Sequence, residues 1–186
     1  VMTAMVGFVL WVTPAGGQGA DWERATTAGI RAYQEKRFDE AQRRLTEALK
    51  IAERAQPRSF HLVLSLISLA DVARTVGEDA DAERLHRRAI SVAEDLNGRH
   101  HPSVELPRQA LAVFSLIKRR YAVTVEAYEQ ILGSAQARSL RPGADEIRYM
   151  NVLADLETLR GRYGEAERWS RRALDHIKLW GTDAGV

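Results

Sequence analysis

The sequence predicts an all-α fold in which four antiparallel helix pairs stack into a solenoid. Apolar residues recur with helical spacing from Asp21 to about Trp180, and no segment keeps the alternation typical of a strand. A pattern of glycine and alanine also returns after 84 residues, which favours stacked repeats over a single globular core. The two copies of this pattern are Gly77, Ala82 and Ala89, and Gly161, Ala166 and Ala173.

Eight helices follow from the positions of caps and breakers. An acidic first turn at Asp21 suits the positive end of a helix dipole, and Asp39 can cap the second helix. Gly77 marks the end of the third helix, and Asp79 begins the fourth. We expect helices at about 21–36, 39–55, 59–76, 79–97, 103–119, 121–138, 145–160 and 164–180.

Caps and helix-breaking residues also mark the helix ends in the second half of the chain. Ser103 can N-cap the fifth helix, and Pro107 lies early enough in that helix to be tolerated. Pro142 and Gly143 break the chain before the seventh helix, and Gly161 ends it. The predicted pairs span about 21–56, 57–98, 99–140 and 141–181, followed by a tail at 182–186.

Small residues fix the register of the pairs. A small side chain is needed where two helices cross closely, since a bulky one would push the axes beyond the usual 8–10 Å. Thr124 and Ile131 occupy two such positions in the third pair, so we expect that pair to be splayed or shifted. The three series, each spaced by 41 or 42 residues, are Gly29, Ala70, Ala112, Ala154; Ala41, Ala82, Thr124, Ala166; and Ala48, Ala89, Ile131, Ala173.

These framework residues resemble the tetratricopeptide repeat. The spacing of about 42 residues, with His101-Pro102 entering one repeat and Tyr149 to Ala154 in a first helix, is similar to the kinesin-light-chain type of that repeat. The resemblance implies a right-handed superhelix whose concave face is lined by the first helix of each pair. It also implies a protein-interaction scaffold, although the repeat by itself does not identify a partner.

Positions counted from the small residue of each first helix give the candidates for a partner groove. They mix apolar residues with both signs of charge, which suits an extended peptide or a partner helix. The alternative is a solvated inner face without a ligand. The candidates are Tyr33, Asp71, Arg74, Gln109, Val113, Arg148, Asn151, Asp155 and Thr158.

Several classes of chemistry find no support in the sequence. The absence of cysteine excludes disulfides, thiolate zinc sites and cysteine nucleophiles. A net charge of +2 does not indicate a nucleic-acid partner. The five histidines show no metal-binding or catalytic spacing, and the glycines form no phosphate-binding loop. We therefore expect no enzyme activity, no cofactor and no metal.

The first twenty residues differ from the rest of the chain. An apolar run from Ala4 to Val12 is followed by Pro14 and small residues up to Ala20, which is the layout of a secretory signal cleaved near Ala20. The run is too short to predict a stable membrane span. No basic residue precedes Arg24, so a floppy or capping segment is the alternative. The first interpretation predicts export to the periplasm or medium, and the second a cytoplasmic protein.

The second helices and the C-terminus raise two further questions. Arginine pairs at 43–44, 87–88 and 171–172 predict either an acidic partner or, as we favour, a solvated face paired with glutamates. The last helix carries Trp169, Leu174, Ile177 and Trp180 without an obvious polar capping helix. This predicts self-association through that helix, unless the chain is part of something longer or Trp169 simply points outward.

The function predicted from these observations is a non-catalytic scaffold that binds a peptide or partner helix in a concave groove. The alternative is a cytosolic regulatory module belonging to a larger signalling or transcriptional protein. No residue pattern identifies the partner.

Overall fold

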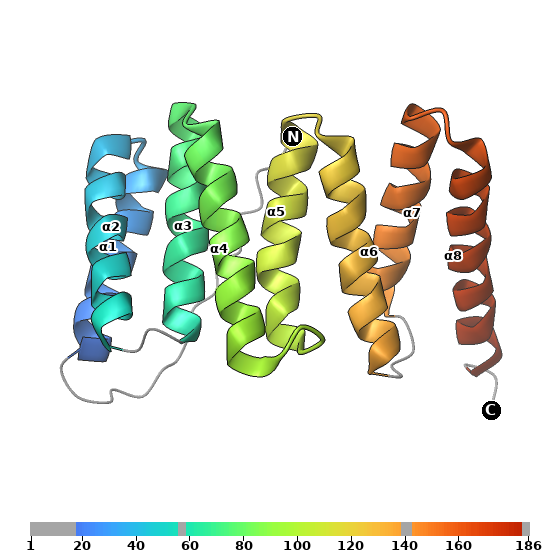
Figure 1. The fold of residues 1–186 in the computed structure, drawn as a ribbon, viewed down its shortest axis with the longest axis horizontal. Coiled ribbons are helices and arrows are strands. Elements are labelled where there is room, and N and C mark those ends of the chain that lie inside the picture. Colours follow the sequence, from blue (N-terminus) through green and yellow to red (C-terminus); the bar gives the residue numbers. More distant parts are fainter. Residues whose placement is uncertain (1–17, 56–58, 139–142, 184–186) are drawn as a thin grey trace.

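The computed structural model describes residues 18–55, 59–138 and 143–183, and these ranges contain eight α-helices, one short 3-10 helix and no strand. The helices stand side by side in chain order, with α1 and α8 at opposite ends of the row (Figure 1). Their bounds are α1 Gln18–Gln34, α2 Phe38–Ala55, α3 Phe60–Val76, α4 Asp79–Asn97, η1 Pro102–Val104, α5 Glu105–Ile117, α6 Tyr121–Ala137, α7 Ala144–Leu159 and α8 Tyr163–Asp183.

The chain is a solenoid of four helix pairs, as predicted. Each odd-numbered helix packs most closely on the even-numbered helix that follows it. In addition, α1 touches α3 and α3 touches α5, whereas contacts among α2, α4 and α6 are sparser. Elements on the inner side of a curved stack lie closer together than those on the outer side. The helices α1, α3 and α5 therefore form the inner layer of the first three pairs, and α7 holds the equivalent place in the fourth pair.

The helix ends mostly follow the predicted signals. The Ser59 side chain accepts a hydrogen bond from the Leu62 amide at the start of α3, and Gly77 ends that helix with φ at 91°. The predicted Ser103 cap of the fifth helix is wrong. Ser103 lies inside η1, and its amide donates to Nδ1 of His101, 3.2 Å away. The proline after His101 favours a tight turn here, so α5 begins only at Glu105.

Close helix crossings explain the small residues. Gly29 of α1 is buried, and a Cβ atom added there would lie 2.6 Å from Cγ of Leu45 on α2. The equivalent alanines at 70, 112 and 154 are buried too. In the third pair Thr124 is fully buried, with its hydroxyl 3.5 Å from the carbonyl oxygen of Ala112. The splaying of this pair stays a prediction.

The buried apolar residues form two main clusters. One runs from Trp22 in α1 to Phe114 in α5, and the other runs from Ala112 in α5 to Ala173 in α8. Both clusters draw on α5, so this helix is where the two halves of the solenoid meet. The indole N–H of Trp22 donates to the Ser65 hydroxyl at 2.8 Å, which anchors the first pair to the second.

A buried arginine ties three helices together beside this meeting point. Arg108 of α5 is 1% exposed and donates to Glu94 of α4 and to the Ser134 hydroxyl of α6, each at 2.7 Å. It also reaches the Gln130 carbonyl oxygen at 3.4 Å. Because a guanidinium is costly to bury without partners, these contacts constrain how α4, α5 and α6 can be placed.

The chain ends differ somewhat from the predicted boundaries. Most of the predicted signal segment 1–20 lies outside the described residues, and only 18–20 are described, as the first residues of α1. Helix α8 continues to Asp183, past the predicted end near Trp180, while residues 184–186 of the predicted tail are not described. None of the helices described here combines the length and apolar character needed to span a bilayer.

Candidate interaction face

All nine predicted groove residues lie on the first helices of the pairs, and the structure brings three of them into one cluster. The Tyr33 hydroxyl of α1 lies 2.8 Å from the Thr75 hydroxyl of α3, and Arg74 donates to Tyr33 at 3.4 Å. Arg74 Nε lies 3.7 Å from Oδ1 of Asp71. This polar cluster links α1 to α3 through hydrogen bonds. We call the solvent side of α1, α3, α5 and α7 the inner face.

Asp71 has an unusual environment for a carboxylate. Its side chain is about one-third exposed, and the Arg74 contact is longer than a hydrogen bond. Burial raises the pKa of Asp71, and the nearby Arg74 charge opposes that rise only in part. The protein therefore replaces the lost hydration of this carboxylate only partially.

The candidates on α7 do not form a cluster. Arg148 pairs with Asp145 of its own helix at 2.8 Å, and its guanidinium lies over the Tyr149 ring, 5.7 Å from the centroid. The Thr158 hydroxyl donates to the Ala154 carbonyl oxygen at 2.9 Å. Asn151 and Asp155 are exposed. This end of the inner face is polar.

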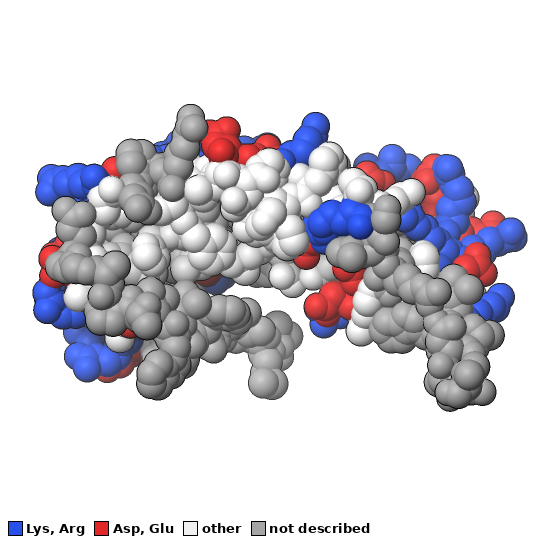
Figure 2. Space-filling model, turned by 90° about the horizontal axis from the view of Figure 1, so that it is seen from below, with Lys and Arg blue, Asp and Glu red and all other residues white. Residues whose placement is uncertain are grey.

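An apolar wall covers the inner face between these two polar regions, and sequence reasoning identified only one of its members. On α5, Val113 is 44% exposed and Ile117 54% exposed, with Leu116 beside them. Figure 2 views the molecule end-on to the helices, and from that side charged residues gather toward the ends of the row and along one edge. The apolar wall consists of Phe60, Leu64 and Ile67 of α3 and Leu106, Val113, Leu116 and Ile117 of α5.

The repeat register could have revealed part of this wall. Leu64 and Leu106 each lie six positions before the small residue of their helix, and Arg148 occupies the same position in α7. In an amphipathic helix such leucines are ordinarily assigned to the core. In the structure both leucines are half-buried, with Leu64 packed partly against the first cluster, so they expose less surface than Val113 and Ile117.

The outer face, formed by the second helices, has the features of a solvated surface. Arg44 pairs with Glu47, Arg87 with Glu83, and Arg171 with Glu167. The predicted pairing with glutamates holds for at least one arginine of each doublet, since Arg88 also pairs with Glu53, while Arg172 donates to Gln136. Exposed pairs of this kind contribute little to stability or recognition.

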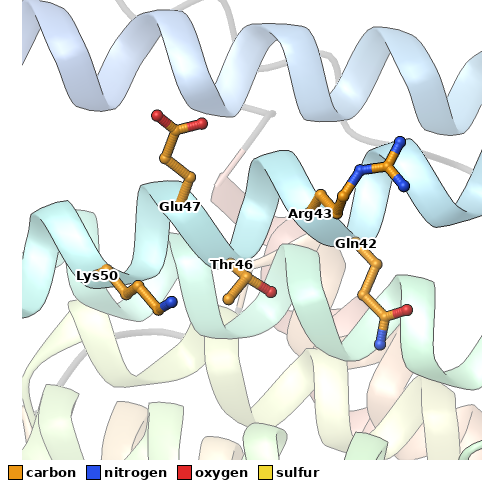
Figure 3. A pocket seen from close by; sticks show the side chains of 5 residues that line it. All are labelled: Gln42, Arg43, Thr46, Glu47 and Lys50. Atoms are coloured by element: carbon orange, nitrogen blue, oxygen red, sulfur yellow. The ribbon is translucent and has the colours of Figure 1, made fainter.

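A depression of about 420 Å³ also lies on this outer side (Figure 3). Its lining comes from a single helix, α2, and mixes both signs of charge. A ligand there would be held from one side only, so the depression lacks the enclosing walls of a small-molecule site. The lining residues are Gln42, Arg43, Thr46, Glu47 and Lys50.

The histidines have structural surroundings. His101 caps η1, and His61 packs against Trp22 with ring centroids 4.2 Å apart. His86 is buried against Phe114, with neither ring nitrogen hydrogen-bonded, and burial lowers its pKa to about 4. Within the described ranges no group of three acidic or histidine side chains is placed to hold a metal ion.

The last helix exposes apolar side chains toward the end of the row. Leu174 is 54% exposed and Ile177 48% exposed, while Trp169 is half-buried against the second cluster. Ile90 and Ala93 of α4, 84 residues earlier, pack into the first cluster instead. The side chain of Trp180 lies outside the described residues.

Comparison with known families agrees with this architecture. Tetratricopeptide-repeat models match residues 26–95 and residues 147–175. The chain belongs to the tetratricopeptide-repeat family. In fold, its helix pairs are similar to those of kinesin-light-chain-like proteins. No curated protein matches the sequence.

Solved structures of other tetratricopeptide-repeat proteins share the fold at low sequence identity. BtubC (BKLC) from P. vanneervenii superposes with a TM-score of 0.73 at 18% identity, covering 91% of this chain and 68% of that one. A Podosopora anserina protein described as a kinesin light chain with nearly identical TPR-like repeats gives 0.69 at 18% identity, with 87% and 76% covered.

A third similar structure is a Rap protein complexed with competence and sporulation factor. It gives a TM-score of 0.65 at 12% identity, and the match covers 91% of this chain but 46% of the Rap protein. At such identities the similarity establishes the fold of this tetratricopeptide-repeat protein and leaves its partner open.

Proposed function

We propose that this tetratricopeptide-repeat protein is a non-catalytic interaction scaffold that binds a peptide or partner helix on its inner face. The observation that carries the proposal is the apolar wall of α3 and α5. Isolated apolar side chains are normal on a surface, whereas a contiguous set framed by polar residues is typical of a binding site. The predicted groove residues Val113 and Asp71 lie in and beside this wall.

The architecture supports binding without chemistry. Stacked helix pairs hold the wall rigidly, so most of the ordering cost on binding falls on the partner. Two buried charged groups have structural contacts, since Arg108 bridges three helices and Glu157 pairs with Arg160 and Arg162. The complex of a similar Rap protein with competence and sporulation factor is consistent with a binding role.

Photo-crosslinking tests the proposal. A photoreactive residue at Val113 should capture a partner in cells that express the protein, and the same residue at the exposed Ser91 of α4 is the control. Ile117→Asp should then remove the Val113 adduct without changing helicity. Equal capture at Val113 and Ser91 would contradict binding at the inner face. So would a Val113 adduct that still forms when Ile117→Asp is present.

We also propose self-association through α8, supported by the exposure of Leu174 and Ile177. Light scattering after gel filtration measures the mass of the particle. Leu174→Glu should reduce that mass to the monomer value, while Leu159→Glu on α7 should leave it unchanged. A monomeric wild-type chain at high concentration would rule the proposal out.

Export is a separate proposal and depends on the N-terminal sequence alone. It is supported by the uncharged run from Ala4 to Val12 and the small residues that follow it. Sequencing the N-terminus of the protein made in its own cells decides the matter. A start near Asp21 supports export, and an intact Val1 favours the cytosolic regulatory module.

A further inference from the structure

We propose that the partner of the inner face is an extended peptide whose apolar residues are flanked by two basic side chains, which pair with Asp71 and Asp155. This inference rests on the proposed function and specifies the chemistry of the partner. The apolar wall would receive the middle of the peptide, and the two carboxylates would fix its ends.

Asp71 and Asp155 occupy equivalent places two repeats apart. Each follows the buried alanine at which its helix crosses the second helix of the pair, Ala70 and Ala154 respectively. Val113 follows Ala112 in the same way and is exposed between them. The three residues therefore form one row across α3, α5 and α7, with an apolar centre and an acid at each end.

The charges around this row favour a basic partner. Arg74 contacts Asp71 only at 3.7 Å and also donates to Tyr33, and burial raises the pKa of Asp71. Arg148, the arginine of α7 on this face, is already paired with Asp145 at 2.8 Å. A cation brought to Asp71 would supply the interaction that its own surroundings provide only in part.

The middle helix adds no competing charge to the row. The two charged side chains of α5 are engaged elsewhere, Glu105 with Arg138 and Arg108 with Glu94. The solvent side of α5 consists of the exposed Val113, Leu116 and Ile117 and the half-buried Leu106, Gln109 and Ala110. A peptide crossing this helix would meet apolar side chains.

The spacing of the row sets the spacing of the basic residues. Packed helices lie about 8–10 Å apart, and the step from α5 to α7, which share fewer contacts than α3 and α5, is no shorter, so the carboxylates lie roughly 20 Å apart or slightly more. An extended chain advances about 3.3 Å per residue, so two basic residues about six positions apart would reach both acids. A helical partner would need about 13 positions. The wall is only two helices wide, which suits the shorter, extended segment.

Selection from a random peptide library tests this chemistry without assuming it. Peptides of about 16 residues, long enough for either spacing, are selected on the wild-type protein and counter-selected on Val113→Asn, which removes the apolar contact without adding charge. Peptides that need Val113 should be enriched in lysine or arginine about six positions apart, with apolar residues between. Circular dichroism confirms that each variant remains helical.

Charge variants then test the two contacts. For an enriched peptide, Asp71→Asn and Asp155→Asn should each weaken binding about two- to fivefold, and the double variant about tenfold or more. Asp81→Asn on the outer side of α4 removes the same charge and should leave affinity unchanged. Added salt should weaken binding to the wild type more than to the double variant.

The outcomes separate this inference from the proposed function. Peptides that need Val113 but lack the basic pair, or that bind the double variant as tightly as the wild type, overturn the inference and leave the binding face intact. Basic residues about 13 positions apart overturn the extended form. Enrichment that never depends on Val113 overturns the binding face itself.

Discussion

The two halves of the solenoid differ in how their helix pairs are joined. From α1 to α5 one continuous apolar cluster crosses every junction, and α3 also touches both α1 and α5. Between α6 and α7 the contact is the thinnest of any successive helices in the described chain. A repeated framework therefore holds the partners within each pair, while cohesion between pairs depends on residues that the repeat does not specify.

The thin junction contains a stacked aromatic pair within the second apolar cluster. Tyr128 of α6 stacks on Tyr149 of α7, with ring centroids 4.9 Å apart and planes inclined by 21°. Both side chains are buried, and burial raises the pKa of both phenols. In the first half many aliphatic side chains join the successive helix pairs.

The largest expected effect is at this stack. Tyr149→Ala should cost about 3–5 kcal/mol and should uncouple α7 and α8 from the rest. Hydrogen exchange would then show the last pair opening while α1 to α4 stay protected. A single cooperative transition with uniform exchange in the variant would show that the halves are coupled by something else.

The second-largest loss of stability is expected when one member of the buried ion pair is removed. Glu94→Ala leaves the Arg108 guanidinium buried without its carboxylate and should cost about 3 kcal/mol. Arg108→Met removes the buried charge itself, and the partly exposed Glu94 can regain water, so its cost should be smaller. Urea unfolding compares the two variants. A larger loss for Arg108→Met would mean that its packing outweighs its charge.

Acid should weaken the first half through His86. Its pKa is about 4 in the folded protein against an ordinary value of 6.5, so the unfolded chain binds the extra proton first. The free energy of unfolding should therefore fall as the pH drops from about 6.5 to about 4, by about 3 kcal/mol in all.

The control is His86→Phe, which keeps an aromatic ring against Phe114. This variant should lose most of the pH dependence in that window when unfolding is followed at several pH values. An unchanged slope would assign the acid sensitivity to other groups.

A smaller effect is expected at the closest helix crossing. Gly29→Ala places a methyl group against Leu45 and should cost about 2 kcal/mol. Gly164→Ala, in the second half, meets no atom within 4 Å and should be neutral or slightly stabilising. Thermal unfolding measures both. Equal melting temperatures would show that α1 and α2 can separate slightly at no cost.

Local sequence signals predicted more of the fold than of the candidate site. Caps and glycines located most helix ends, and the small residues at helix crossings gave the register, because both depend on neighbours close in sequence. The Ser103 cap failed because His101 caps a short 3-10 helix that contains Ser103, so α5 begins only at Glu105. The bond from Arg108 to Glu94 joins different repeats, and no periodic signal predicts such a pair.

The apolar wall was missed for a related reason. Leu64, Leu106 and Ile117 have the spacing of core residues, and whether such residues are buried depends on how neighbouring pairs are placed. Asp71 and Val113 were found because they could be counted from a small residue in the repeat. The nature of the inner face thus depends on the stacking of pairs, which emerges only when all of the helices are in place.

The row of helices in Figure 1 also has a mechanical consequence. Because α1 and α8 lie at opposite ends, a pulling force applied to the two termini passes through every junction in series. Such a chain yields at its weakest link, and the thin contact between α6 and α7 would part first. The remaining pairs would keep the inner wall of α3 and α5 intact, so the molecule could lengthen under load while it still held its partner.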